Sequence, residues 1–149
     1  MDPLSIITVI SAGLKMIDQF RELALRLRGQ APTPPKGTAE QKGTALEVKY
    51  EDRVVHKVDA SDLNLGEWDR VRYDALRQRL RTNWNIYNDL FASEAGAEAG
   101  EGARIRADLH RVEETLCNDF REMVRLYERA LGTSLPDHYQ LREVCGPTA

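Results

Sequence analysis

The sequence is poor in the side chains that most enzyme and metal sites need. It contains two cysteines and three histidines in 149 residues. Cys117 and Cys145 form neither a C-x-x-C pair nor a disulfide framework, so we expect reduced, intracellular cysteines and an inert packing role for Cys145. The histidines are scattered, and no H-E-x-x-H motif or glycine-rich phosphate loop occurs. We therefore expect no enzyme activity, no catalytic residues, no cofactor and no metal.

One cluster on a predicted helix could suggest a metal site. His110, Glu113, Glu114 and Cys117 lie within two helical turns of one another. Metal ligands usually converge from several elements, however, and these four share one. A solvated helical face, with Cys117 at the edge of the core, is the favoured interpretation.

Long hydrophobic runs and an excess of positive charge are also absent. No segment approaches the roughly 20 apolar residues that span a bilayer. Asp2 occupies the place where a signal peptide would carry positive charge, so we expect a soluble, cytoplasmic protein. The net charge is −3, whereas phosphate contacts require a basic surface, and no nucleic-acid partner is expected.

The amino-terminal segment is the least charged part of the chain. The stretch PLSIITVISAGL has no charged residue, and Asp2 and Pro3 suit the start of a helix over residues 3–28. Steps of three and four residues divide this helix into two stripes. The apolar stripe reads Ile6, Ile10, Gly13, Ile17, Phe20, Ala24 and Leu27, widened by Leu14 and Leu23. If this helix leaves the core, the residues that could insert into a membrane are Leu4, Ile6, Ile7, Val9, Ile10, Leu14 and Ile17. The opposite, polar stripe consists of Ser5, Thr8, Ala12, Lys15, Gln19, Glu22 and Arg26.

The next segment interrupts the helical pattern. Residues 30–44 are rich in proline, glycine and threonine and predict a flexible linker. Over residues 45–58, Leu46, Val48 and Tyr50 alternate with polar residues on one side of a turn at 51–53. This alternation predicts a short β-hairpin, which must lean on the helices because an isolated hairpin is marginally stable.

Residues 64–145 return to helical periodicity. A second helix should start near Asn64, with Glu67 as its capping partner, and residues 93–102 should form a flexible loop. The third helix should end at Gly132, and a short fourth helix should occupy residues 136–145. The apolar stripe of the second helix reads Trp68, Val71, Ala75, Leu76, Leu80, Trp84, Tyr87 and Phe91, and that of the third reads Ile105, Leu109, Val112, Leu116, Phe120, Val124, Tyr127 and Leu131.

Together these patterns predict one mainly all-α domain over residues 1–149. We expect a four-helix bundle-like domain with a small β-hairpin insertion between its first and second helices. The predicted core residues, beyond the apolar stripe of the first helix, are Phe20, Leu80, Trp84, Leu109, Val112, Leu116, Phe120 and Tyr127.

The opening MDPLSI, followed by a small and aliphatic run and then a charged amphipathic continuation, resembles a group of cell-death domains. It looks like the HeLo and HELL domains of fungal receptor-type proteins and the related bacterial Bell domains. More distantly it is similar to the four-helix bundles of mixed-lineage kinase-like pseudokinases and of plant resistance proteins. The resemblance covers residues 1–27, and the hairpin departs from the usual four-helix description.

This resemblance implies a membrane-permeabilising role in an innate-immunity system. The first helix would become exposed on activation, insert into membrane lipid at the inner face of the membrane, and act as a homo-oligomer downstream of a signalling or receptor protein. Twelve uncharged residues cover about 18 Å, less than the roughly 30 Å hydrocarbon core, so one helix cannot span alone. In an oligomer, the polar stripe could line a water-filled lumen.

A second interpretation, without a membrane, remains open beside the first. The apolar stripe of the first helix can equally fill the core of a helical bundle, with the polar stripe as its solvated face. The chain would then be a non-enzymatic helical adaptor that binds another protein and never engages a membrane.

Overall fold

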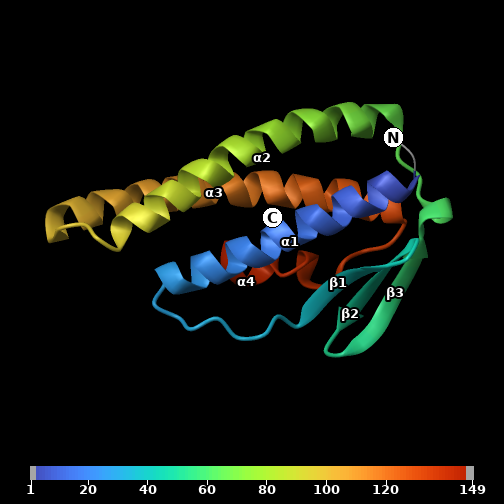
Figure 1. Ribbon diagram of the computed structural model, residues 1–149, viewed down its shortest axis with the longest axis horizontal. Helices are drawn as coiled ribbons and strands as arrows, with labels where there is room; N and C mark the ends of the chain where they lie inside the picture. Colours follow the sequence, from blue (N-terminus) through green and yellow to red (C-terminus); the bar gives the residue numbers. More distant parts are fainter. Residues whose placement is uncertain (1–2, 147–149) are drawn as a thin grey trace.

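The structure is a computed structural model that describes residues 3–146. The chain is mainly helical, as predicted, with a small antiparallel sheet (Figure 1). In chain order the elements are α1 (Pro3–Leu27), β1 (Gly37–Lys42), β2 (Ala45–Tyr50), β3 (Arg53–Asp59), the 3-10 turn η1 (Ala60–Asp62), α2 (Glu67–Glu94), α3 (Ala99–Leu131), the 3-10 turn η2 (Pro136–His138) and α4 (Leu141–Cys145).

The three long helices lie side by side. In Figure 1, α2 and α3 form a long antiparallel hairpin, and α1 runs along this hairpin in the same direction as α2. The closed end of the hairpin extends beyond the end of α1, while α4 and the sheet lie on the other side of α1 from α2. The first helix therefore lies between the hairpin on one side and α4 with the sheet on the other.

The first and third helices begin and end close to their predicted bounds. Asp2, the expected N-cap of α1, lies outside the described residues. α1 ends at Leu27, followed by Gly29 in the left-handed region, with a φ of 73°. Gly132 has a φ of 70° and its N–H donates to the carbonyl of Glu128, which ends α3 as the sequence predicted. The apolar stripe of α3 is buried, except that Val112 is half-buried.

The predicted linker over residues 30–44 is wrong for its second half. Residues 37–42 form β1, which pairs with β2, and β2 pairs with β3 in a three-stranded sheet in place of the expected hairpin. The segment GTAEQK has no apolar alternation that would predict a strand. It can form an edge strand all the same, because backbone hydrogen bonds to β2 hold it in the sheet. Leu46 and Val48 of β2 are fully buried, so the sheet leans on the helices as expected.

Two boundaries of the second helix also differ from the prediction. The capping box at Asn64 is wrong: α2 begins at Glu67 after Gly66, whose side-chain-free backbone leaves no capping hydrogen bond. The N–H of Asn64 donates instead to the carbonyl of Ala130, which fixes the entry to α2 against the end of α3. The loop expected over residues 93–102 shrinks to 95–98, because alanine and glutamate extend both helices toward their connection.

The predicted fourth helix over residues 136–145 is mostly absent. Asp137, His138, Tyr139 and Gln140 all have positive φ angles, which a right-handed helix does not permit. Only the five residues of α4 are α-helical. The described part of the chain therefore has three long helices and one short one.

The core prediction is confirmed for most residues and wrong for three. Phe20, Leu80, Leu109, Leu116, Phe120 and Tyr127 are buried, and Trp84 and Val112 are half-buried. The aromatic ring of Phe20 lies 5.1 Å from Phe120 and 5.6 Å from Tyr87, measured between ring centroids. Trp68, Val71 and Ala75 were expected in the core and are exposed instead. Tyr73 takes the buried position at that end of α2.

Candidate interaction surfaces of the first two helices

The residues predicted to insert into a membrane form the buried face of α1. Ile7, Ile10, Leu14 and Ile17 are fully buried in a single cluster of core side chains. Ile6 and Val9 are half-buried and pack against the same cluster, and the side chain of Leu4 lies outside the described residues. In this state the apolar stripe of α1 is core.

The predicted polar stripe faces solvent. Thr8, Ala12, Lys15, Gln19, Glu22 and Arg26 are exposed, and Ser5 is half-buried. The first charged residue on this face is Lys15, so the exposed side of α1 is as free of charge as its buried side over the first three turns. This uncharged solvent face distinguishes α1 from every other long helix of the chain.

The second half of α1 is held by an ion pair between the buried Arg21 and the exposed Glu143 of α4. The guanidinium of Arg21 is 3% exposed and donates to both carboxylate oxygens of Glu143, at 2.7 Å from Nε and 3.1 Å from Nη2. Its Nη1 also donates to the carbonyl oxygen of Thr33 at 2.8 Å. A bidentate pair fixes both partners in orientation, so α1, α4 and the loop before β1 are joined at one residue.

A second arginine joins the end of α1 to α3 and α4. Arg28 pairs with Glu113 at 3.1 Å and donates to the backbone carbonyl of Val144. Glu113 is buried on α3 and accepts a 3.0 Å hydrogen bond from the hydroxyl of Tyr87 on α2. Burial and the neighbouring carboxylate raise the pKa of Tyr87 above its usual value, so the phenol stays protonated and donates. These bonds leave the carboxylate of Glu113 satisfied rather than available as a metal ligand.

Asp18 supplies a third contact between α1 and the segment before α4. Its carboxylate accepts hydrogen bonds from the side-chain amide of Gln140 at 3.0 Å and from the hydroxyl of Tyr139 at 3.3 Å. Burial raises the pKa of Asp18 to about 6, and these hydrogen bonds only partly oppose the shift. We call these contacts of Asp18, Arg21 and Arg28 the carboxy-terminal clamp.

The expectation of two reduced cysteines is wrong for this structure. Cys117 on α3 and Cys145 on α4 are joined by a disulfide, with 5.7 Å between their Cα atoms. The five-residue helix α4 folds back against α3 and brings together two cysteines that are 28 positions apart in the chain. The disulfide therefore ties the clamp to the α2–α3 hairpin.

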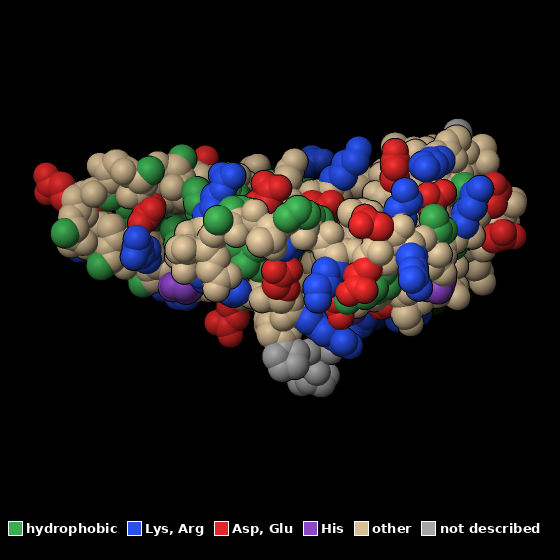
Figure 2. All heavy atoms as spheres, turned by 90° about the horizontal axis from the view of Figure 1, so that it is seen from below, with side chains coloured by type: hydrophobic (Ala, Val, Ile, Leu, Met, Phe, Trp, Pro, Cys, Tyr) green, Lys and Arg blue, Asp and Glu red, His purple; other side chains and the backbone are tan. Residues whose placement is uncertain are grey.

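An apolar surface lies on α2, where the sequence predicted core. Trp68 is 83% exposed and Val71 is 58% exposed, and with the exposed Ala75 they form what we call the α2 patch. The pairs Asp69–Arg129 and Arg72–Glu122 flank it, at 2.7 and 2.6 Å. By contrast, Figure 2 shows the face below α1, where hydrophobic side chains appear in small areas between charges of both signs.

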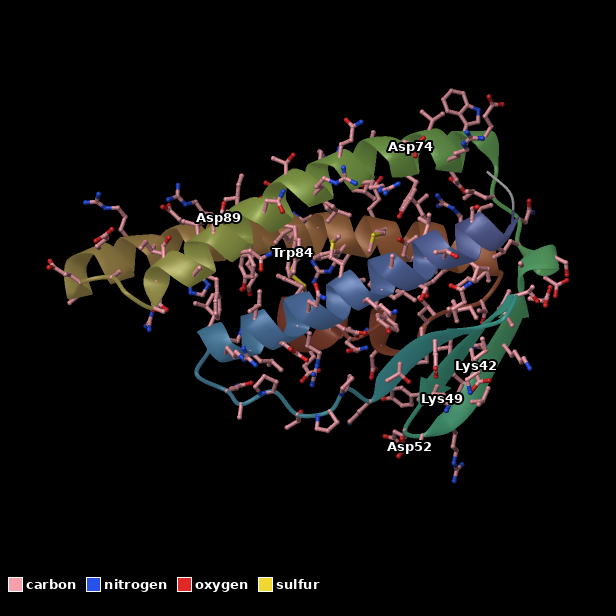
Figure 3. The ribbon with its side chains drawn as sticks, viewed as in Figure 1. Lys42, Lys49, Asp52, Asp74, Trp84 and Asp89 are labelled. Atoms are coloured by element: carbon pink, nitrogen blue, oxygen red, sulfur yellow. A yellow bond between two sulfur atoms is a disulfide. The ribbon has the colours of Figure 1, made fainter. Side chains whose placement is uncertain are left out.

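A groove separates α1 from α2, with α3 as its floor. One hollow is lined by Thr8, Val9, Ala12, Gly13, Met16, Tyr73, Arg77, Leu80, Arg81 and Met123. It adjoins a smaller apolar hollow that shares Val9 and Tyr73 with it. Figure 3 shows Trp84 between α1 and α2, where its indole stacks on Tyr87 and meets the ring of Phe20. We call the space from Ile6 to Met16 the α1–α2 groove.

Gly13 is required at the point where α1 crosses α3. A Cβ atom at this position would lie 2.0 Å from the hydroxyl oxygen of Tyr127. That hydroxyl is hydrogen-bonded to the hydroxyl of Tyr73 at 2.9 Å, which ties the floor of the groove to α2. The close approach of Gly13 to Tyr127 could not be predicted from the position of Gly13 in the sequence.

Comparisons with protein-family models, curated proteins and solved structures found no match to this chain. Within residues 3–146, no helix has the length and apolar character needed to cross a bilayer. No group of three histidine, cysteine, aspartate or glutamate side chains in that part of the chain could hold a metal ion. The surfaces that remain to be explained are the α2 patch and the α1–α2 groove.

Proposed function

We propose that this chain is a non-enzymatic signalling module that works by self-assembly, with the α2 patch as the contact between copies. The exposure of Trp68 is the observation that carries the proposal. Single exposed apolar residues are normal on protein surfaces, but an exposed tryptophan beside an exposed valine on one helix is not. The proposal shares with the adaptor alternative of the sequence analysis that the chain is non-enzymatic and acts through a protein contact, but here the partner is a second copy of the chain.

The energetics of burial support this assignment. Tryptophan is enriched among the residues that dominate interfaces, and truncating such a residue costs at least about 2 kcal/mol of binding free energy. Two ion pairs flank the patch, Asp69 with Arg129 and Arg72 with Glu122. The patch itself is uncharged, so a second copy of the same patch can cover it without burying a charge at the centre of the contact.

Sedimentation analysis across a range of protein concentrations tests the proposal. We expect wild-type protein to associate reversibly and Trp68→Ala to weaken association by about 30-fold, the equivalent of about 2 kcal/mol. Ile86→Ala is the matched control, because Ile86 is 42% exposed on the same helix but outside the patch. A monomeric wild type at high concentration, or equal weakening by both substitutions, contradicts the proposal.

Membrane permeabilisation by α1 is a second candidate function, in which the chain is a cell-death execution module that oligomerises at the membrane. Its support is the uncharged α1, on both faces, from Ser5 to Leu14. Releasing α1 would expose seven buried apolar residues, and each large one loses about 1.5–3 kcal/mol of burial free energy. Contact with lipid or with other copies must therefore contribute on the order of 10 kcal/mol. The seven residues are Ile7, Ile10, Leu14, Ile17, Phe20, Ala24 and Leu25.

Dye release from anionic vesicles tests this second candidate. Val9→Asp places a charge on the half-buried edge of α1, where circular dichroism can confirm that the variant still folds. Ile86→Asp is the control, because it adds the same charge to an exposed apolar site of α2. We expect leakage by wild type and Ile86→Asp and none by Val9→Asp. If wild-type protein releases no dye, α1 does not permeabilise membranes.

A further inference from the structure

We infer that the α1–α2 groove binds an acidic amphipathic helix of a partner protein. The groove runs beside the first half of α1, from Ile6 and Leu65 at one end to Met16 and Arg81 at the other. On α2 its wall extends from Arg70 to Arg81, which is about 16 Å or three helical turns. The short α4 lies on the other side of α1, so no described helix covers this space (Figure 1).

The shape and lining of the groove suit a helix. The larger hollow lies between two helical walls, and its floor is apolar, with Leu80 and Met123 buried beneath it. The α1 wall presents the small, exposed side chain of Ala12, and small residues allow another helix axis to approach closely. Met16 adds a flexible apolar side chain, which adapts to the shape of a partner.

The charge of the groove selects an acidic partner. Arg70, Arg77 and Arg81 are exposed along the α2 wall, and none of them forms an ion pair with any residue that the structure describes. Asp74 is the acidic residue that lines the same wall, and the lining residues of α1 carry no charge. The wall therefore has a net charge of about +2, and complementary charge steers and orients a partner.

The groove and the α2 patch thus differ in the partners that they suit. Two ion pairs flank the patch, whereas Arg70, Arg77 and Arg81 of the groove form no ion pair with any residue that the structure describes. The occupant is accordingly a different protein segment, an amphipathic helix of about three turns with its acidic residues on the side facing α2. This inference rests on the proposed function as an interaction module, but it concerns a separate surface.

Binding of a labelled model helix tests the inference by fluorescence anisotropy. The probe is a designed peptide of about 18 residues with leucines on one face and glutamates on the flanks, and its partner control carries lysine in place of glutamate. We expect saturable binding of the glutamate peptide only. Arg77→Glu with Arg81→Glu should weaken it at least tenfold, and Ala12→Trp should weaken it similarly by filling the groove.

Matched variants separate this site from general charge effects and from self-assembly. Arg53→Glu with Arg104→Glu changes the net charge equally at exposed positions outside the groove, and it should bind the peptide within about twofold of wild type. Trp68→Ala should bind the peptide normally even where it no longer self-associates, which distinguishes failure of this inference from failure of the proposed function. The inference is overturned if neither peptide binds, or if Ala12→Trp and the Arg77→Glu, Arg81→Glu variant bind the peptide normally. It is also overturned if Arg77 and Arg81 are needed for binding to anionic vesicles but not for binding to the peptide.

Discussion

The first and second helices use their apolar residues in opposite ways. α1 has the most hydrophobic sequence of the chain, and its stripe of Ile7, Ile10, Leu14 and Ile17 is fully buried. α2 is more polar, yet Trp68 and Val71 on it are among the most exposed large apolar side chains. Hydrophobicity alone therefore does not identify an interaction surface, because the most hydrophobic stripe of the chain is the one that is buried in the core. The informative residues are those that the core leaves uncovered.

The two helices also differ in how firmly they are held. α1 is fixed by the carboxy-terminal clamp, in which Arg21 and Arg28 contact α4 and Asp18 contacts the segment that leads into it. α2 packs along α3, but its α2 patch faces away from that contact and is bordered by ion pairs at the surface. Substitutions in α1 should therefore act on stability, and those in the α2 patch should act on association.

The largest expected effect follows from truncating the buried stripe of α1. Leu14→Ala should lower the free energy of unfolding by about 2–5 kcal/mol, because a buried leucine is replaced by a cavity. Urea denaturation followed by circular dichroism measures the change, with the exposed Lys15→Ala as the neighbouring control. A loss below about 0.5 kcal/mol would show that α1 is not part of the core.

The next effect tests the tie between the clamp and the hairpin. Replacing both Cys117 and Cys145 by serine should lower the free energy of unfolding by about 2–4 kcal/mol, mainly through the entropy of the unfolded chain. Equilibrium denaturation of the oxidised wild type, the reduced wild type and the double variant provides the comparison. Reduced wild type and double variant should agree, and an unchanged midpoint on reduction would mean that the disulfide is absent in solution.

A smaller effect is expected from the protonation of Asp18. Its pKa is raised to about 6 in the folded protein from 3.8, so between about pH 4 and pH 6 the folded state binds more protons than the unfolded state. The contribution of Asp18 to the free energy of unfolding should therefore fall as pH rises through this range and level off above it. The contribution of Asp18 is present at low pH and lost at high pH.

Asp18→Asn isolates this contribution. The variant keeps a polar group beside Gln140 and Tyr139 but cannot titrate, so the difference from wild type should change with pH only between about 4 and 6. Burial lowers the pKa of His138, which titrates in both proteins and cancels in the difference. A difference that is constant with pH would show that Asp18 stays ionised in the clamp.

The sequence predicted the helices from their periodicity, and it missed features that depend on distant parts of the chain. The stripe of α3 and the ends of α1 follow from steps of three and four residues and from glycine. For α2 two stripes fit such steps, one through Trp68 and Val71 and one through Tyr73 and Leu76, and only the position of α3 decides between them. Local pattern could not make that choice.

The features missing from the predicted site have the same origin. β1 is an edge strand without apolar alternation, so the sequence GTAEQK predicted a linker. The strand forms because its backbone pairs with β2, which local sequence does not show. The disulfide and the clamp depend on the positive φ angles at residues 137–140, which turn α4 back onto α1 and α3.

The smallest expected effect on stability is the one that most sharply divides the two helices. Trp68→Ala should change the free energy of unfolding of the monomer by no more than about 0.5 kcal/mol, because an 83% exposed side chain makes few contacts to lose. Leu80→Ala, three turns further along α2 and fully buried, should cost about 2–5 kcal/mol. Thermal or urea denaturation at low protein concentration keeps self-association out of both measurements. Equal losses in the two variants would place Trp68 in the core, as its spacing in the sequence suggested, and would remove the basis for the α2 patch. A stable Trp68→Ala that no longer associates would instead show that a tryptophan with the periodicity of a core residue serves contact between molecules.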